Sequence, residues 1–196
     1  PFQDKNSLGT WEYIALGKLL DSTVYFAAYS NDERVIALKK HMIDAAIACQ
    51  EPDGYIGMFA PGKRLTNLWD IHEMSYLILG MMRDYQYFGE KKSLDSAVKM
   101  MDYMITNWKN AHPWTQAKVG LDYTALQMYN ATGDEKYLKF CLEERKLAVW
   151  DKPIKLIAPS TGDEDGDGID GHHAYAYMDE CRSQLELYPI QPDEKL

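Results

Sequence analysis

The chain has 196 residues and a mass of 22.5 kDa, enough for one sizeable core and for two domains at most. Its net charge of −9 argues against a nucleic-acid or anionic-membrane partner, because both bind basic surfaces. A hydrophobic content of 46% with 26% charged residues is ordinary for a globular protein, and it excludes neither an enzyme nor a binding module.

The sequence indicates neither a membrane-spanning segment nor a disulfide framework. No apolar run reaches about 18 residues, and no signal-like segment follows Pro1, so the sequence indicates no compartment. The three cysteines, Cys49, Cys141 and Cys181, are widely spaced and form no CxxC pair. They are therefore expected to be free thiols, and they predict no zinc site.

Three short segments predict tight turns between antiparallel helices. Each contains a residue suited to left-handed backbone, followed by charged residues and an apolar helical pattern; these residues are Asn31, Gly89 and Gly133. The acidic residue directly after each of them suits the first turn of the next helix. The spacings of 58 and 44 residues are near those of helical repeats.

From these turns we expect seven helices, near residues 10–29, 31–50, 69–88, 90–109, 117–131, 133–150 and 170–187. The first, third and fifth contain 3, 4 and 2 charged residues, whereas the second, fourth and sixth contain 6, 7 and 8. A helix that is apolar on nearly all sides is buried, and one with a charged face is peripheral. The sequence therefore predicts an all-α fold with an inner and an outer layer, as in an α/α-barrel or a helical solenoid.

The longer connections, near residues 51–68, 110–116 and 151–169, each join an outer helix to the next inner one. Long loops therefore gather at one end of the inner helices, where functional residues are expected. A closed barrel of six hairpins needs roughly 300 residues at this repeat length. Residues 1–196 are thus expected to be a single domain: a partial (α/α)6-barrel-like toroid of about seven helices that belongs to a longer barrel.

Histidines, tryptophans and acids concentrate at the long-loop end. Four of the five histidines lie there, among them His72, His172 and His173. The other candidate binding residues are Glu12, Asp53, Tyr55, Trp69 and Glu73. Aromatic rings on apolar walls with a few convergent polar groups suit a neutral polar ligand, so the cluster predicts a carbohydrate pocket. The alternative for any single residue is a structural role, such as a helix cap or a loop anchor.

His72 and Glu73 are adjacent, and successive side chains on a helix diverge by about 100°. Only one of them can point squarely into a cavity. We expect His72 to do so and Glu73 to be a structural partner, with a substrate contact as the second interpretation. The pair does not form an HExxH zinc motif, because Tyr76 stands where the second histidine is needed.

An acidic loop begins at Asp163 and places oxygen ligands at alternate positions, with Asp165 and Asp167 following and Gly168 at the sixth position of a calcium loop. The twelfth position is Ala174, which excludes a complete EF-hand. Two interpretations stay open: a calcium site completed by other residues, and a solvated loop at the mouth of the cleft.

Five motifs, in order, resemble the β-L-arabinofuranosidase-type glycoside hydrolases, a family long known only as a domain of unknown function. They are Gln50-x-x-Asp53-Gly54-Tyr55-Ile56-Gly57, Trp69-x-x-His72-Glu73, Tyr87-x-Gly89, Leu126-x-x-Tyr129-x-Ala131-Thr132-Gly133-Asp134 and Gly171-His172-His173-Ala174. The resemblance covers approximately residues 10–187. This part of the chain is similar to the N-terminal half of the family's catalytic barrel. It implies an (α/α)6 barrel with a central sugar pocket, acting on arabinofuranosides or related plant-wall glycans.

The resemblance also implies roles for single residues. The family's pocket histidines carry over to His72 and to either His172 or His173. The family's proposed nucleophile is a zinc-bound cysteine in the C-terminal half of the barrel, and this chain lacks that cluster. The resemblance therefore implies binding and positioning by this chain, without the family's nucleophile or its zinc site and with the catalytic residues unidentified, in a periplasmic, secreted or cytoplasmic protein.

Other functions stay open on the sequence alone. If the reaction uses two carboxylates, the candidates are Glu12, Asp53, Glu73 and Asp170; helix N-termini lower carboxylate pKa values, which favours bases over acids.

A lyase on the same fold would use Tyr76 or His72 as its base, but only Lys63 and Arg64 could hold an acidic polymer. The alternative to an enzyme is a non-catalytic helical-repeat interaction domain, in which loss of Trp69 and His72 would not change glycan binding.

Overall fold

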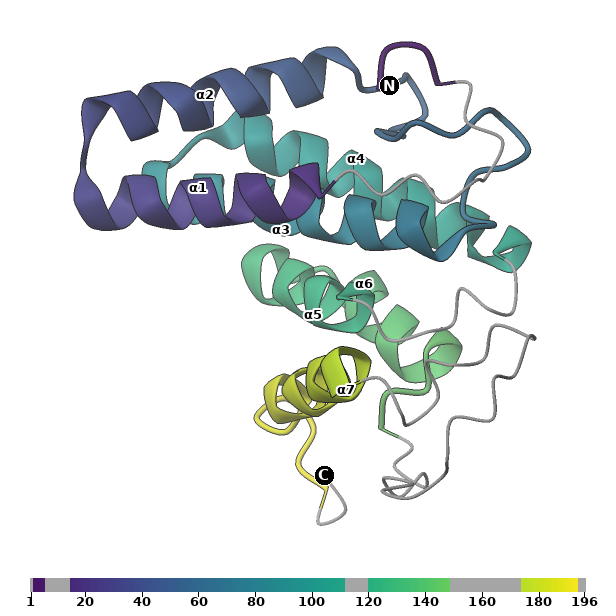
Figure 1. Ribbon diagram of the computed structural model, residues 1–196. Coiled ribbons are helices and arrows are strands. Elements are labelled where there is room, and N and C mark those ends of the chain that lie inside the picture. The colour runs from purple at the N-terminus through teal and green to yellow at the C-terminus, as the bar shows by residue number, and fades with distance from the viewer. Residues whose placement is uncertain (1, 6–14, 112–119, 149–173, 194–196) are drawn as a thin grey trace. The chain divides into compact units, whose positions relative to one another are not determined.

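The computed structural model describes residues 2–5, 15–111, 120–148 and 174–193, and this part of the chain is helical without any strand (Figure 1). Its α-helices are α1 (Leu16–Ser30), α2 (Glu33–Ala48), α3 (Leu68–Phe88), α4 (Lys91–Asn107), α5 (Leu121–Thr132), α6 (Glu135–Lys139) and α7 (Ala174–Leu187). A 3₁₀ helix, η1 (Trp108–Asn110), follows α4, and a π-helical segment, η3 (Phe140–Glu144), continues α6. The all-α prediction is confirmed, and the chain divides into two compact units, Pro1–His112 and Pro113–Leu196.

The three predicted turns are present. Asn31, Gly89 and Gly133 end α1, α3 and α5 with φ angles of 50°, 72° and 70°, in the left-handed region. Asp32 and Asp134, which follow two of them, each accept a hydrogen bond from the backbone N–H two residues further on. The turns therefore form as helix C-cap and N-cap pairs, for the reasons that the sequence indicated.

Some helix boundaries differ from the prediction. The helix expected from residue 10 begins at Leu16, directly after left-handed backbone at Ala15 (φ 52°), and residues 10–14 lie outside the described part. The helix expected over 133–150 changes to a π-helical turn at Phe140, and left-handed backbone at Lys146 (φ 52°) follows it. The predicted starts at 117 and 170 also lie outside the described residues; α5 begins at Leu121 and α7 at Ala174.

In the first unit, α1 and α3 run parallel and lie unusually close together. Contacts between them advance along both helices, from Gly17 with Glu73 to Tyr25 with Tyr87. A Cβ added at Gly17 would lie 2.7 Å from the backbone oxygen of Glu73, and one added at Gly80 would lie 3.1 Å from a backbone nitrogen of α1. Parallel inner helices were predicted, and two glycines permit this approach.

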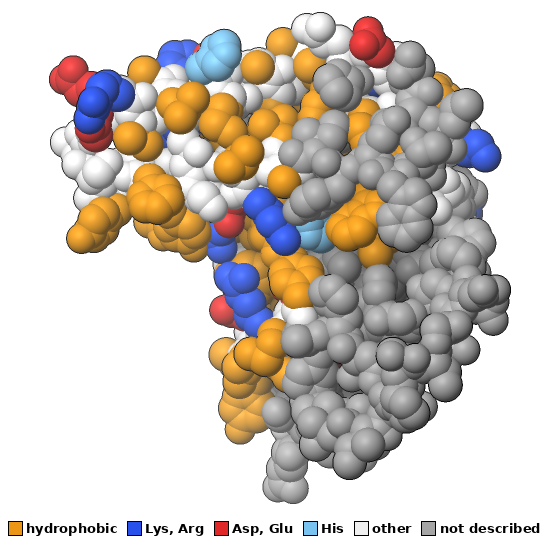
Figure 2. All heavy atoms as spheres, viewed as in Figure 1, with side chains coloured by type: hydrophobic (Ala, Val, Ile, Leu, Met, Phe, Trp, Pro, Cys, Tyr) orange, Lys and Arg blue, Asp and Glu red, His pale blue; other side chains and the backbone are white. Residues whose placement is uncertain are grey.

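The two layers differ in burial as the charge pattern predicts, with one exception. Fourteen of the 21 residues of α3 are buried, compared with six of 17 in α4. α1 has few charges, yet it packs on α2 and α3 along one face and exposes Leu19, Phe26 and Tyr29 on the other, with exposed fractions of 58%, 65% and 90%. Hydrophobic side chains are visible at the end of the unit where α1 turns into α2 (Figure 2).

A buried ion pair ties both outer helices to α3. The ammonium group of Lys39 on α2 donates to Asp84, and the other carboxylate oxygen of Asp84 accepts a 2.6 Å hydrogen bond from Ser93 on α4. Both charged side chains are almost fully buried. Because each charge satisfies the other, removing either partner alone would strand a buried charge.

The second unit repeats the parallel arrangement. The backbone N–H of Gly120, before α5, donates to Asp179 on α7 over 2.6 Å, Arg182 lies 3.5 Å over the ring of Tyr123, and Gln127 donates to Glu186. The two hydrogen bonds join residues 59 positions apart, so α5 and α7 keep one register along their length.

Within the same unit, the guanidinium of Arg145 bonds both carboxylate oxygens of Asp122, at 2.6 and 3.2 Å. This buried pair fastens the end of η3 to the beginning of α5.

Gly17→Ala should destabilise the chain, because the new methyl group would meet backbone atoms that cannot yield. We expect a loss of about 1–3 kcal/mol in the free energy of unfolding, measured by urea denaturation. The matched control is Ser22→Ala, an exposed position on the same helix, which should leave stability within about 0.5 kcal/mol. Equal stability of the Gly17→Ala variant and the unmodified chain would contradict the close approach of the helices.

Candidate carbohydrate pocket in the first unit

The loop between α2 and α3 is fixed against α4 at its beginning. The side-chain amide of Gln50 donates to the carbonyl oxygens of Gly54 and Ser96, both over 3.0 Å. Gly54 has a φ of 102°, and a Cβ there would lie 2.3 Å from the carbonyl oxygen of Lys99. Only glycine fits this position, which explains the Asp53-Gly54 dipeptide.

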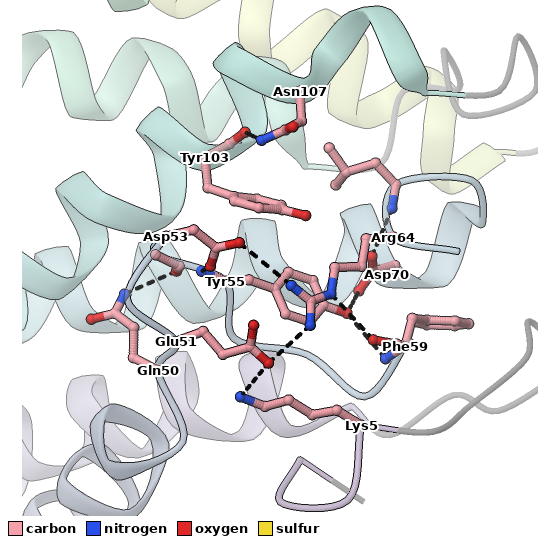
Figure 3. Close-up of polar contacts among 12 residues, drawn as sticks. Lys5, Gln50, Glu51, Asp53, Tyr55, Phe59, Arg64, Asp70, Tyr103 and Asn107 are labelled. Carbon is pink, nitrogen blue, oxygen red and sulfur yellow. Dashed lines mark hydrogen bonds and ion pairs between the residues drawn. The ribbon is translucent and has the colours of Figure 1, made fainter. Parts of the chain in front are cut away.

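The centre of the loop is held by a buried hydroxyl–carboxylate contact. The Tyr55 hydroxyl donates to Asp70 Oδ1 over 2.8 Å, and it accepts the N–H of Phe59 over 3.1 Å (Figure 3). The other oxygen of Asp70 accepts the N–H of Leu65 over 2.9 Å. Burial, followed by the charge of Asp70, raises the pKa of the Tyr55 hydroxyl, so it stays a proton donor.

A second brace is the guanidinium of Arg64, which lies 4.0 Å above the Tyr55 ring. It donates to Glu51 over 2.8 Å and to Asp53 over 3.5 Å, and Glu51 also pairs with Lys5 at 3.1 Å (Figure 3). Arg64 is therefore committed to carboxylates of its own loop, and the lyase interpretation loses one of its two candidate cations.

A small pocket opens beside this loop. Its enclosed space is about 10 Å³, room for roughly one water molecule, and it opens into solvent. It is lined by Phe2, Gly57, Met58, Phe59, Trp69, Asp70 and Glu73. Trp69 is partly exposed, whereas Asp70 and Glu73 are buried, at 2% and 7% exposure. The pocket therefore combines the aromatic ring of Trp69 with two carboxyl groups that lie three residues apart on α3.

The two carboxylate oxygens of Glu73 differ in their hydrogen bonding. Its Oε1 accepts the N–H of Gly17 over 2.7 Å, and its Oε2 is buried without a hydrogen-bond partner among the described residues. Burial raises the pKa of Glu73, and burial raises the pKa of Asp70 to about 6. The expected lowering of the carboxylate pKa at a helix N-terminus is wrong for Glu73, because desolvation outweighs the hydrogen bonds that favour the charged form; the same holds for Asp70.

His72 lies on another side of α3. It is 2% exposed and lies between two aromatic rings, with ring centroids 5.8 Å from Trp69 and 5.0 Å from Tyr76. Burial, helped by the charge of Lys18, lowers its pKa to about 4, so the imidazole is neutral at neutral pH. The pocket borders Glu73 rather than His72, and a substrate contact by His72 stays a prediction.

Apart from His72, the predicted site residues fall into three groups. Trp69 and Glu73 meet in the pocket, and Asp53 and Tyr55 support its wall. Glu12, His172, His173 and Asp170, together with the possible calcium ligands Asp163, Asp165 and Asp167, lie outside the described residues. Sequence reasoning missed Asp70 as a pocket group, although its position three residues before Glu73 places both on one helix face.

The described residues do not fit a zinc site. No group of three or more His, Cys, Asp or Glu side chains lies close enough to hold a metal ion in the described ranges. The buried thiol of Cys141 donates to the carbonyl oxygen of Asp122 over 3.7 Å. Cys49 and Cys181 are partly exposed free thiols. No described helix is both long and apolar enough to cross a bilayer.

Comparison with known proteins identifies relatives. Residues 5–195 match the family model described as the β-L-arabinofuranosidase GH127 catalytic domain. The crystal structure of a GH127 β-L-arabinofuranosidase from Geobacillus stearothermophilus T6 superposes with a TM-score of 0.57 and 22% identity, over 98% of this chain and 29% of the other.

A second GH127 β-arabinofuranosidase structure gives a TM-score of 0.51 and 18% identity, over 78% of this chain and 28% of the other. No curated protein matches significantly. The likeness confirms the helical-barrel fold, and the chain spans less than a third of either relative's length.

The raised pKa of Asp70 predicts that stability falls as the pH rises. A carboxyl whose folded pKa is about 6, against an ordinary aspartate pKa of 3.8, stabilises the fold below pH 3.8 and loses that contribution as the pH passes 6. Between about pH 4.5 and pH 7.5 this amounts to roughly 2 kcal/mol. Urea titration of Asp70→Asn at both pH values should show the variant gaining that amount relative to the unmodified chain. A difference that does not change with pH would contradict the assignment.

Proposed function

The chain belongs to the GH127 β-L-arabinofuranosidase catalytic-domain family, and we propose that it supplies part of the substrate pocket of a glycoside hydrolase that acts on arabinofuranosides. The observation that carries the proposal is the pocket lined by the Trp69 ring and by Glu73, whose Oε2 is buried without a hydrogen-bond partner among the described residues. Both solved relatives are named as arabinofuranosidases, which supports this substrate class.

The chemistry of the pocket suits a neutral sugar. Sugar C–H faces pack on aromatic rings, and hydroxyl groups donate to carboxylates. An unbonded buried carboxylate oxygen is unfavourable in the free protein, and a ligand hydroxyl would remove that penalty. With its raised pKa, Glu73 can also hold a proton and donate it to a ligand oxygen.

The proposed contribution of residues 1–196 is binding and orientation. Holding a substrate in a reactive geometry can lower a barrier by about 7–11 kcal/mol in favourable systems, although it breaks no bond. The bond-breaking groups are expected in the rest of the barrel, because this chain corresponds to less than a third of either solved relative.

Titration of the chain with methyl β-L-arabinofuranoside, followed by NMR, tests the proposal. We expect saturable binding that weakens at least tenfold, or about 1.4 kcal/mol, in Trp69→Ala and Glu73→Gln. Tyr87→Ala removes an exposed aromatic ring near the other end of α3 and is the matched control, which should bind normally. Methyl β-D-xylopyranoside should bind more weakly than the arabinofuranoside.

Two results would contradict the proposal: the absence of saturable binding by the unmodified chain, and equal binding by Trp69→Ala and Tyr87→Ala. The first would also favour an interaction domain without a sugar pocket.

A further inference from the structure

We propose that Asp70 is a positioning residue, whose carboxylate holds the Gly57–Phe59 wall of the pocket by binding both ends of the loop segment 55–65. One oxygen accepts the hydroxyl of Tyr55 at the beginning of the segment, and the other accepts the N–H of Leu65 at its end. A single side chain on α3 thus closes the loop on itself.

The wall depends on this closure through direct contacts. The N–H of Phe59 donates to the Tyr55 hydroxyl over 3.1 Å, so the hydroxyl connects the wall to the carboxylate. At Gly57, an added Cβ would lie 2.2 Å from the Tyr55 hydroxyl oxygen and 2.8 Å from Asp70 Oδ1. The backbone of the wall therefore lies directly on the hydroxyl–carboxylate pair.

The helix itself does not need Asp70. Asn67 caps α3, because its side-chain oxygen accepts the N–H of Trp69 over 2.8 Å. A buried carboxyl beside a second acid, Glu73, is unfavourable for folding unless it has another role. The bonds to Tyr55 and Leu65 supply that role. Asp70 also lines the pocket, next to the Gly57–Phe59 wall.

Amide exchange measured by NMR tests the closure without any ligand. In Asp70→Ala, we expect the amides of Phe59 and Leu65 to exchange at least tenfold faster. The exchange rates of amides in the middle of α4 should rise only by the amount that the loss of global stability explains. Tyr55→Phe should accelerate Phe59 more than Leu65, because it removes only the hydroxyl. Asp70→Asn should recover much of the Leu65 protection, since its oxygen still accepts that N–H.

Asp84→Asn is the matched control. Asp84 is also a buried acid of α3, bonded to Lys39 and Ser93 and far along the helix from the pocket. Asp84→Asn should lower the global stability. The amides of Phe59 and Leu65 should then exchange faster only by the amount that this loss of global stability explains. Equal opening of the wall in Asp84→Asn and Tyr55→Phe, or unchanged exchange in Tyr55→Phe and Asp70→Ala, would overturn the proposal. Tyr55→Phe keeps the test decisive if Asp70→Ala does not fold.

The effect on sugar binding rests on the proposed function and is measured separately. Tyr55→Phe should weaken the binding of methyl β-L-arabinofuranoside at least fivefold, whereas Asp84→Asn should not. If the unmodified chain does not bind this sugar, the proposed function fails and the positioning role is decided by amide exchange alone. If the sugar binds equally well to Tyr55→Phe while the wall opens, the wall does not position the ligand and the proposal is overturned.

Discussion

The close parallel approach of α1 and α3 is the constraint on which the first unit depends. Two glycines, one on each helix, bring the backbones together where any larger residue would meet main-chain atoms of the neighbour. At this separation the beginning of α1 can donate a backbone N–H to Glu73. The orientation of that side chain therefore follows from helix packing, whereas the loop supplies Gly57, Met58 and Phe59 to the pocket.

Three buried aspartates fasten different parts of the fold. Asp84 joins α3 to the two outer helices, Asp122 fastens the start of α5 to the end of η3, and Asp70 binds the loop beside the pocket. All three are nearly inaccessible to solvent, and each has specific donors. In a fold made of similar hairpins, such pairs select one register among several that apolar contacts alone would permit.

The sequence was sufficient for the parts of the fold that local chemistry determines. Asn31, Gly89 and Gly133 needed left-handed backbone, and the turns they predict are present. The alternation of charge correctly separated α3 from α4. Burial of α1 could not be predicted in the same way, because it depends on which neighbours cover its second face, and helix composition does not specify them.

The site was harder to predict because neighbouring side chains differ in what surrounds them. The sequence could place His72 and Glu73 on different sides of α3, but only the packing of α1 decides which side borders the pocket. Tyr55 shows the same limit: its motif indicated a sugar contact, whereas its hydroxyl is bonded to Asp70 in the interior. That substrate role remains a prediction, as do those of the residues outside the described ranges.

Glu73 has two roles in the fold, since one oxygen accepts the N–H of Gly17 at the start of α1 and the residue also lines the pocket. Thermodynamic linkage is reciprocal, so if a ligand that bonds Glu73 changes the strength of its bond to Gly17, the packing of α1 changes the affinity for that ligand by the same free energy. Occupancy would then be transmitted through a single carboxyl group to the packing of the inner layer. Ligand binding and the packing of α1 against α3 would in this way depend on each other.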